Sequence, residues 1–301
     1  AMNAFGDDKV LLEKYITSPR HIEVQVMSDG KGNHFHFFER ECSIQRRYQK
    51  VIEESPSSIL TDSIRSEICA TAVKISSYMN YEGAGTIEYI LDTDGKFYFL
   101  EMNTRLQVEH PITEMVTGYD LVKLQILAAR GEAFSFKQED IKQCGHAIET
   151  RIYAENPDEG FLPSVGKISV VGKVTGEGVR LDTGYNDGNV VTISFDPMLA
   201  KLITYAATRE QAIEKMINAL CDIPFLGVMT NREYLERILS HKAFIAGDTF
   251  THFIETYKDD LSKKELTNYE KALTIASYYD GLNTDHQHSN PWNNLSSFRN
   301  V

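Results

Sequence analysis

Apolar and polar residues alternate with a period of two in several short runs of the chain. Two such runs, Thr86 to Leu91 and Lys96 to Asn103, are rich in β-branched and aromatic residues. Asp92 to Gly95 lie between them and have the composition of a tight turn. This pattern predicts a β-hairpin.

Two carboxylates share one face of this predicted hairpin. A four-residue loop would pair Glu88 with Phe99 and Thr86 with Glu101, so that Glu88 and Glu101 lie at diagonal reach. The same face would carry the apolar residues Ile90, Phe97 and Phe99. Two acids there would repel each other and lose hydration unless a cation lay between them. We expect Mg²⁺ or Mn²⁺ bound by Glu88, Glu101 and the nearby Asn103; a solvent-exposed face with incidental acids is the alternative.

Other segments predict a mixture of strands and helices. Residues 20–29 and 34–38 have strand patterns around a turn at 29–33, and residues 145–205 have short strand patterns between Gly and Asp turns. Helical periodicity occurs at 61–80, 120–130, 208–221 and 231–240, with Thr61 or Asp62, Thr208 and Asn231 as candidate N-terminal caps. The segment Thr117 to Asp120, before the second of these helices, resembles a capping box. The chain is therefore predicted to be α+β, with a β-rich second domain.

Composition narrows the functional classes. The chain has 301 residues, a net charge of −12 and a pI near 5.3. An acidic protein of this size favours an enzyme with a substantial core and disfavours nucleic acid as a partner. Its four cysteines form no CxxC pair, and no apolar run is long enough to span a membrane. We therefore expect a cytoplasmic protein without a membrane partner.

Ionisable and hydrogen-bonding side chains crowd into the segment Glu101 to Glu114. Pro111 disfavours helix at His110 and cannot donate to a central sheet ladder. Residues 104–110 should therefore be irregular backbone that presents side chains to a cleft. The alternative is a solvated charged loop.

Three long motifs resemble biotin carboxylase, the ATP-grasp component of biotin-dependent carboxylases. They are EMNTRLQVEHPITE at 101–114, EYILDTDGKFYFL at 88–100 and ERECSIQRRYQKVIEESP at 39–56. The resemblance runs from about Glu13 to the region of Ile254. SFDPMLAKLI at 194–203 and FLGVMTN at 225–231 look most like the α subunits of propionyl-CoA, methylcrotonyl-CoA and acetyl-CoA carboxylases.

The resemblance implies a domain order. Residues 1–15 would be a remnant of the ATP-grasp lid and hinge, and 16–140 the ATP-grasp body, the C-terminal half of that fold with an antiparallel sheet and helices. Residues 141–256 would be a small β-rich biotin carboxylase C-terminal domain, and 257–301 a linker toward a following domain. Because the lid would be missing, we expect the chain alone to lack bicarbonate-dependent ATP cleavage.

The resemblance also assigns site residues. Those implied for ATP are Glu13, Lys14, Ile16, His21, Gln45, Tyr48, Ile90 and Glu101; the family usually has histidine where this chain has Tyr48. Those implied for bicarbonate and biotin are Lys50, Arg105, Gln107, Val108 and Arg151. Glu109, Arg105, Arg151 and Lys50 would be catalytic. Cations can orient a small anion while a nearby carboxylate takes its proton, so Glu109 is the implied base. Arg151 would face the ureido oxygen of biotin.

The implied activity is ATP- and bicarbonate-dependent carboxylation of carrier-bound biotin through carboxyphosphate. The implied partners are a biotin carboxyl carrier domain, further protomers of an oligomeric parent enzyme, and a carboxyltransferase subunit. Two alternatives remain at this point. The chain could be a non-catalytic assembly module from a truncated gene, or part of another ATP-grasp carboxylase such as pyruvate carboxylase. An arginine that faces biotin favours a carboxylase over an amino-acid ligase.

Overall fold

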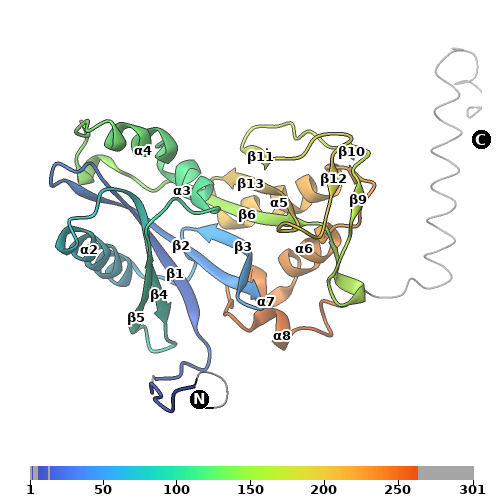
Figure 1. Cartoon of the computed structure of the whole chain (residues 1–301), viewed down its shortest axis with the longest axis horizontal. Coiled ribbons are helices and arrows are strands. Elements are labelled where there is room, and N and C mark those ends of the chain that lie inside the picture. Colours follow the sequence, from blue (N-terminus) through green and yellow to red (C-terminus); the bar gives the residue numbers. More distant parts are fainter. Residues whose placement is uncertain (1, 3–5, 13, 264–301) are drawn as a thin grey trace, which may run out of the picture. The chain divides into compact units, whose positions relative to one another are not determined.

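One antiparallel sheet organises the part of the chain described by the computed structural model, which comprises residues 2, 6–12 and 14–263. The sheet has eight strands in the order β11-β13-β6-β3-β2-β1-β4-β5 (Figure 1). These strands are β1 Arg20–Ser28, β2 His34–Arg46, β3 Gln49–Ser55, β4 Gly83–Leu91, β5 Phe97–Asn103, β6 His146–Tyr153, β11 Val179–Thr183 and β13 Met198–Ala206. The α+β fold class is confirmed.

Short elements complete the C-terminal region. Three two-stranded ribbons pair β7 with β8, β9 with β12 and β10 with β14. Their bounds are β7 Glu155–Asn156, β8 Leu162–Pro163, β9 Gly166–Lys167, β10 Val170–Val171, β12 Val190–Val191 and β14 Phe225–Leu226. Single 3₁₀ turns occur at η1 Gln138–Asp140 and η2 Pro157–Glu159.

Helices cover both faces of the sheet. α2 Asp62–Tyr78 packs on β1 and β2, and α5 Arg209–Asp222 packs on β13 and β6. Strand alternation places these two helices on one face and α3 His110–Thr117 and α4 Leu121–Ala129 on the other. The smaller helices are α6 Arg232–Leu239, α7 Lys242–Ile245 and α8 Phe253–Thr256. Within the described ranges, no helix has the length and apolar content needed to cross a membrane.

The helices predicted at 61–80, 120–130, 208–221 and 231–240 are confirmed as α2, α4, α5 and α6, and Thr61 and Thr208 cap their helices as expected. Thr61, Asp120 and Thr208 each accept a hydrogen bond from a backbone N–H in the first turn. Asn231 is the N-cap residue of α6, as predicted, but its side chain makes no capping hydrogen bond. Instead Asn231 accepts from the Tyr153 N–H at 2.8 Å and donates to the Arg151 carbonyl at 3.0 Å. It therefore ties α6 to β6.

The predicted hairpin is present, but its register is wrong. Glu88 pairs directly with Glu101, and Thr86 with Asn103. Two shifts account for the difference. Leu91 pairs with Phe97 instead of Lys96, which moves the register by one residue at the turn, and a bulge between Glu88 and Tyr89 moves it by one more. Phe97 consequently packs in the core beneath α2 rather than beside the acids.

Helix begins earlier than the sequence indicated near Pro111. Residues 104–109 are irregular as predicted, but His110 is the first residue of α3. Pro111 occupies the first turn, where its missing N–H costs no hydrogen bond. The loop is thereby fixed against the sheet by the helix that follows it.

The sheet is continuous across the boundary predicted at 140/141. β3 from the first region pairs with β6 from the second, with Glu53 opposite Glu149. The division into domains stays a prediction. Residues 264–301, most of the predicted linker, lie outside the described residues, as does Glu13.

Candidate functional site

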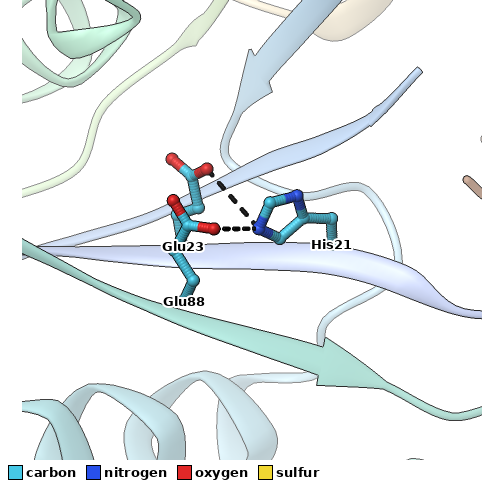
Figure 2. A group of neighbouring side chains, drawn as sticks. All are labelled: His21, Glu23 and Glu88. Carbon is cyan, nitrogen blue, oxygen red and sulfur yellow. Dashed lines mark hydrogen bonds and ion pairs between the residues drawn. The ribbon is translucent and has the colours of Figure 1, made fainter. Parts of the chain in front are cut away.

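Polar side chains at every second position of β1 line the face of the sheet that carries α3 and α4. His21, Glu23 and Gln25 are buried there, while the aliphatic residues between them pack beneath α2. His21 Nε2 lies 2.7 Å from Glu88 Oε2 and 3.6 Å from Glu23 Oε1 (Figure 2). Ligand atoms of these three residues all lie within 4.8 Å of one another. Sequence reasoning missed Glu23, although polar residues alternating with aliphatic ones in this strand could have revealed it.

Glu88 and Glu101 differ in environment although they are paired. Glu88 is buried and accepts hydrogen bonds from Asn103 Nδ2 at 2.7 Å and Gln107 Nε2 at 2.8 Å. Burial by itself raises the pKa of Glu88, but the His21 hydrogen bond and the Lys50 charge outweigh it and lower the pKa to about 2. Glu101 is exposed and lies 3.2 Å from Asn103 Nδ2.

Lys50 joins three carboxylates at the centre of the site. Its Nζ donates to Glu23, lies 2.7 Å from Glu109 Oε1 and lies 3.3 Å from Glu88 Oε1. Burial would lower the pKa of Lys50, but the surrounding carboxylates, Glu23 foremost, raise it well above its ordinary value. The ammonium group is therefore held charged.

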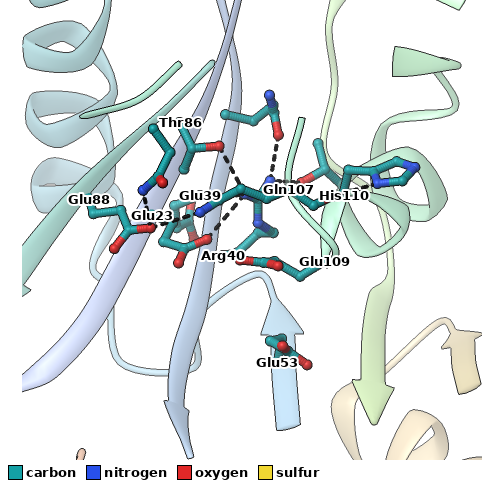
Figure 3. A network of polar contacts seen from close by, with 12 residues as sticks. Glu23, Glu39, Arg40, Glu53, Thr86, Glu88, Gln107, Glu109 and His110 are labelled. Carbon is teal, nitrogen blue, oxygen red and sulfur yellow. Dashed lines mark hydrogen bonds and ion pairs between the residues drawn. The ribbon is translucent and has the colours of Figure 1, made fainter. Parts of the chain in front are cut away.

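A second cation, Arg40, lies fully buried behind Lys50. Its guanidinium donates to Glu23 Oε2 at 3.1 Å and to Gln107 Oε1 at 2.9 Å, which links β2, β1 and the loop before α3 (Figure 3). Burial raises the pKa of Glu23, yet Lys50 and Arg40 together lower it to about 2. Arg40 was not predicted from the sequence. It fixes the side chain of Gln107, which the resemblance had placed in the bicarbonate pocket.

Glu109 is held between two cations. One oxygen accepts from Lys50, and the other accepts from Arg151 Nη2 at 2.8 Å. Arg151 also donates through Nε to Glu53 Oε1 at 2.6 Å. Glu109 and Glu53 are buried, so the Arg151 guanidinium joins two carboxylates that have little water around them. The structure thus brings Lys50, Glu109 and Arg151 together, although Lys50 and Arg151 lie far apart in the sequence.

The loop between β5 and α3 is less uniform than its sequence suggested. Arg105 is exposed and reaches Leu106 O at 3.3 Å and Asn103 Oδ1 at 3.4 Å, without a carboxylate partner among these contacts. Val108 contributes its backbone carbonyl, which accepts from Lys201 of β13. Lys201 is a further residue that sequence reasoning missed.

A cleft of about 560 Å³ opens beside these groups. Its lining includes six of the residues predicted for ATP: Ile16, His21, Gln45, Tyr48, Ile90 and Glu101. It also includes Lys50, Glu88, Asn103, Arg105 and Gln107. Lys14 lies outside this lining and binds Asp92 and Tyr98 at the hairpin tip, at 3.1 and 2.8 Å.

Two predicted nucleotide residues have unexpected surroundings. Gln45 lies 2.7 Å from His21 Nδ1 through its side-chain amide, so it orients the imidazole that contacts Glu88. Tyr48 has a positive φ of 66° in the β2–β3 turn and is 91% exposed. A side chain so placed can contact a ligand in the cleft, which it lines.

The donor set fits a hard divalent cation. Carboxylate oxygens of Glu88 and Glu101 face the cleft together with the amide of Asn103, and oxygen is the donor that Mg²⁺ and Mn²⁺ prefer. Asn103 presents its NH₂ group to both acids. Rotation of this amide would present its oxygen instead, so the three residues can change from a hydrogen-bonded group to a ligand set.

Two family models match the chain. The Carbamoyl-phosphate synthase L chain, ATP binding domain matches residues 1–137, and the Biotin carboxylase C-terminal domain matches residues 149–256. The chain therefore belongs to the biotin carboxylase family, of which it contains the C-terminal half of the ATP-grasp fold and the domain that follows.

Its relatives are the biotin carboxylase parts of several biotin-dependent carboxylases. The mitochondrial methylcrotonoyl-CoA carboxylase alpha subunit of Dictyostelium discoideum is 42% identical over 99% of this chain and 44% of its own length. The propionyl-CoA carboxylase alpha chain of Ruegeria pomeroyi is 47% identical over 84% of this chain and 40% of its own length. The chain thus spans less than half the length of these two relatives.

The fold is also similar to that of solved biotin carboxylase structures. The biotin carboxylase domain of a thermophilic 2-oxoglutarate carboxylase bound to bicarbonate has a TM-score of 0.85 and 43% identity, covering 87% of this chain and 59% of that chain. The corresponding domain of Hydrogenobacter thermophilus, in complex with MgADP, ADP and bicarbonate, has a TM-score of 0.83 and 44% identity, covering 88% of this chain and 58% of that chain. Biotin carboxylases of this family are ATP-dependent carboxylating ligases.

Proposed function

We propose that this face of the sheet carries out the ATP- and bicarbonate-dependent carboxylation of biotin. The observation that carries the proposal is Glu109, whose two oxygens are held by Lys50 at 2.7 Å and Arg151 at 2.8 Å. A carboxylate between two cations, with a cleft next to it, can receive a small anion and take its proton. Of the solved structures named above, one is bound to bicarbonate and the other to MgADP, ADP and bicarbonate, which supports this chemistry.

The nucleotide end of the cleft lies at β4 and β5. Ile16, Ile90 and Tyr48 would contact the base and ribose, with Glu13 and Lys14 near the hinge, while His21 and Gln45 would order Glu88. Glu88, Glu101 and Asn103 would hold Mg²⁺ or Mn²⁺, which supplies positive charge to the phosphate groups during phosphoryl transfer. The chain's own contribution is to present two acids from paired strands at one point of the cleft.

Bicarbonate would bind among Lys50, Arg105, Gln107 and the backbone of Val108. Arg105 is exposed and bonded only to nearby oxygens in the described contacts, so it can turn toward an anion. Glu109 would take the proton of bicarbonate as its oxygen attacks the γ-phosphorus of ATP, giving carboxyphosphate and ADP. Lys50, held charged by its three carboxylates, would balance the charge of the attacking anion.

Biotin would bind on the Arg151 side of Glu109. Carboxyphosphate would release CO₂ and phosphate, and the phosphate would take the proton from N1 of biotin. Arg151 would stabilise the negative charge that then forms on the ureido oxygen, and N1 would attack CO₂ to form the new N–C bond. We propose that a carrier domain supplies the biotin and that its recipient is a carboxyltransferase subunit, in an oligomeric cytoplasmic enzyme. Relatives in multidomain or multisubunit carboxylases support these partners.

Two variants of a full-length biotin carboxylase that carries these residues test the proposal. Glu109→Gln removes the base, so ATP cleavage and biotin carboxylation should fall together by roughly a hundredfold or more. Arg151→Gln should reduce carboxylation by roughly 10²–10³ and ATP cleavage less, because its charge acts after bicarbonate is activated. ADP and carboxybiotin are measured in parallel.

Arg130→Gln is the matched control, because Arg130 is an exposed arginine paired with Glu132 at 2.9 Å. It should leave both rates unchanged. Equal ratios of ADP to carboxybiotin in the Glu109 and Arg151 variants would contradict the role given to Arg151. Undiminished turnover of Glu109→Gln would contradict the role given to the base.

A further inference from the structure

Two glutamates that the proposed mechanism does not use lie side by side behind Arg151. Glu53 of β3 and Glu149 of β6 are opposite each other in the antiparallel ladder, and both are 0% exposed. Side chains in such positions stand on the same face with their Cβ atoms roughly 5 Å apart. Two ionised carboxylates at this distance, without water, would repel each other strongly.

The two glutamates differ in the number of hydrogen bonds that they accept. Arg151 Nε donates to Glu53 Oε1 at 2.6 Å. Among the described residues, neither oxygen of Glu149 has a hydrogen-bond partner, and neither does Glu53 Oε2. Three buried carboxylate oxygens without a donor are costly, since an unpaired buried polar atom loses its hydration without compensation.

Charged groups from several elements surround the pair. β6 contributes Arg151, β13 contributes Lys201 opposite Arg151, and the loop before α3 contributes Glu109 with Lys50 of β3 beyond it. α3 itself packs Ile112 and Val116 against Ala147 and Ile203, the strand neighbours of Glu149. Lys201 is already engaged with the Val108 carbonyl and lies 3.6 Å from Asp182. No cation is therefore assigned to Glu149 by the contacts of the described residues.

We propose that Glu53 and Glu149 share one proton at neutral pH, that Glu149 carries it, and that it donates its O–H to the free oxygen of Glu53. This single proton removes the repulsion and supplies a donor to Glu53 Oε2. It leaves Glu149 neutral and Glu53 ionised toward Arg151. The electrostatics agree in direction: burial raises the pKa of Glu53 to about 7, and burial with the neighbouring Glu53 raises the pKa of Glu149 well above its ordinary value.

Glu149 would thereby act as a positioning residue for Arg151. Arg151 divides its donors between Glu53 and Glu109, and a second ionised carboxylate behind it would draw the guanidinium away from Glu109. A neutral Glu149 leaves the Arg151 Nη2 group bonded to Glu109, in the position that the proposed carboxylation requires. This consequence rests on the proposed function, whereas the proton itself does not.

Infrared spectroscopy of this chain tests the proton without nucleotide, bicarbonate or biotin. At about pH 8, ordinary carboxyl groups are ionised, so a carbonyl stretch from a protonated carboxyl group should come from the buried pair. The wild-type chain should show this band, and Glu149→Gln should lose it. Glu54→Gln is the matched control: Glu54 is the next residue along β3 and is also buried, but Arg209 and His146 hold it ionised.

Loss of the band in Glu149→Gln together with its presence in Glu54→Gln supports the proposal. A band that survives Glu149→Gln overturns it, because the proton then belongs to another group. If Glu149→Gln does not fold, ¹³C NMR of labelled glutamate carboxyls in the wild-type chain decides. At least one glutamate should keep the chemical shift of a protonated carboxyl at about pH 8, and the absence of any such signal overturns the proposal.

Discussion

Among the described strands, four pairs of glutamates lie directly opposite each other, and two of these pairs differ sharply, one at the edge of the sheet and one in its middle. At the edge, Glu88 on β4 faces Glu101 on β5; in the middle, Glu53 on β3 faces Glu149 on β6. Both pairs belong to antiparallel ladders. The pKa of Glu88 is nevertheless lowered to about 2, whereas that of Glu53 is raised to about 7.

The two pKa values differ because the two pairs have different numbers of hydrogen-bond donors and different exposure to water. Glu88 accepts from His21, Asn103, Gln107 and Lys50, and its partner Glu101 is exposed. In the interior pair, Glu53 accepts from Arg151, which also donates to Glu109, whereas neither oxygen of Glu149 has a hydrogen-bond partner among the described residues. A pair of acids at the edge of the sheet is therefore suited to bind a cation, because a ligand can enter there. A pair in the middle, which a ligand cannot reach, is suited to share a proton.

The largest expected effect comes from removing a buried acid that has a full set of donors. Glu54 accepts from Arg209 Nε at 2.6 Å and lies 2.8 Å from His146 Nε2. Glu54→Gln would leave these groups without their anion, so it should lower the free energy of unfolding by about 3–5 kcal/mol. Urea unfolding followed by circular dichroism measures this. A loss below about 1 kcal/mol would mean that donors do not govern the interior acids.

The next effect is the pH dependence of stability. Because the folded-state pKa of Glu53 and Glu149 lies above the unfolded value of 4.5, the native state binds more protons, and stability falls as pH rises from 4.5 toward about 7 and beyond. Each bound proton contributes a slope of about 1.4 kcal/mol per pH unit. Glu149→Gln should flatten this slope.

Urea midpoints of wild type and Glu149→Gln across that pH range supply the measurement. Glu54→Gln is the control, and it should change stability on the acid side. Burial raises the pKa of Glu54, but the His146 hydrogen bond and Arg209 lower it to about 2, so its stabilising contribution is lost below pH 4.5. Parallel curves for wild type and Glu149→Gln would count against a shared proton.

The smallest effect on stability is expected at the edge pair. Glu101→Gln should change the free energy of unfolding by less than about 0.5 kcal/mol, because Glu101 is exposed. Combined with Glu88→Gln, it should weaken Mn²⁺ binding in the presence of ADP by at least about tenfold. Paramagnetic relaxation of water protons measures bound Mn²⁺. Equal binding by wild type and the double variant would remove these acids from the ligand set.

Local chemistry made much of the fold predictable. The caps at Thr61, Asp120 and Thr208, and the turn at Asp92 to Gly95, depend on residues within a few positions of one another. Capping and turn residues of this kind can be recognised from a single sequence. The exact register of the hairpin was not predictable, because the pairing at the turn and a bulge in the strands each shift it by one residue without a mark in the composition.

The candidate site was predictable where its residues share one motif. Glu101 to Glu109 form a contiguous run, but Glu23, Arg40, Glu149 and Lys201 enter the site through strand pairing with distant segments. The strand pairing also determines which of two buried carboxylates lies next to a positively charged side chain. Asn231 was predicted to cap a helix, but its side chain forms hydrogen bonds with the backbone of β6 instead. These contacts depend on how the helix and the strand pack together, which the local sequence does not show.

The seam where β3 meets β6 limits how this family can be rearranged. Each of the two matched segments contributes one strand to the seam, and the Arg151–Glu109 contact spans it. Separating the segments would expose two unpaired strand edges in the middle of the sheet and split the reactive centre between two polypeptides. Recombination or engineering that exchanges whole modules should therefore carry residues 16–256 as a single block, with junctions placed outside it.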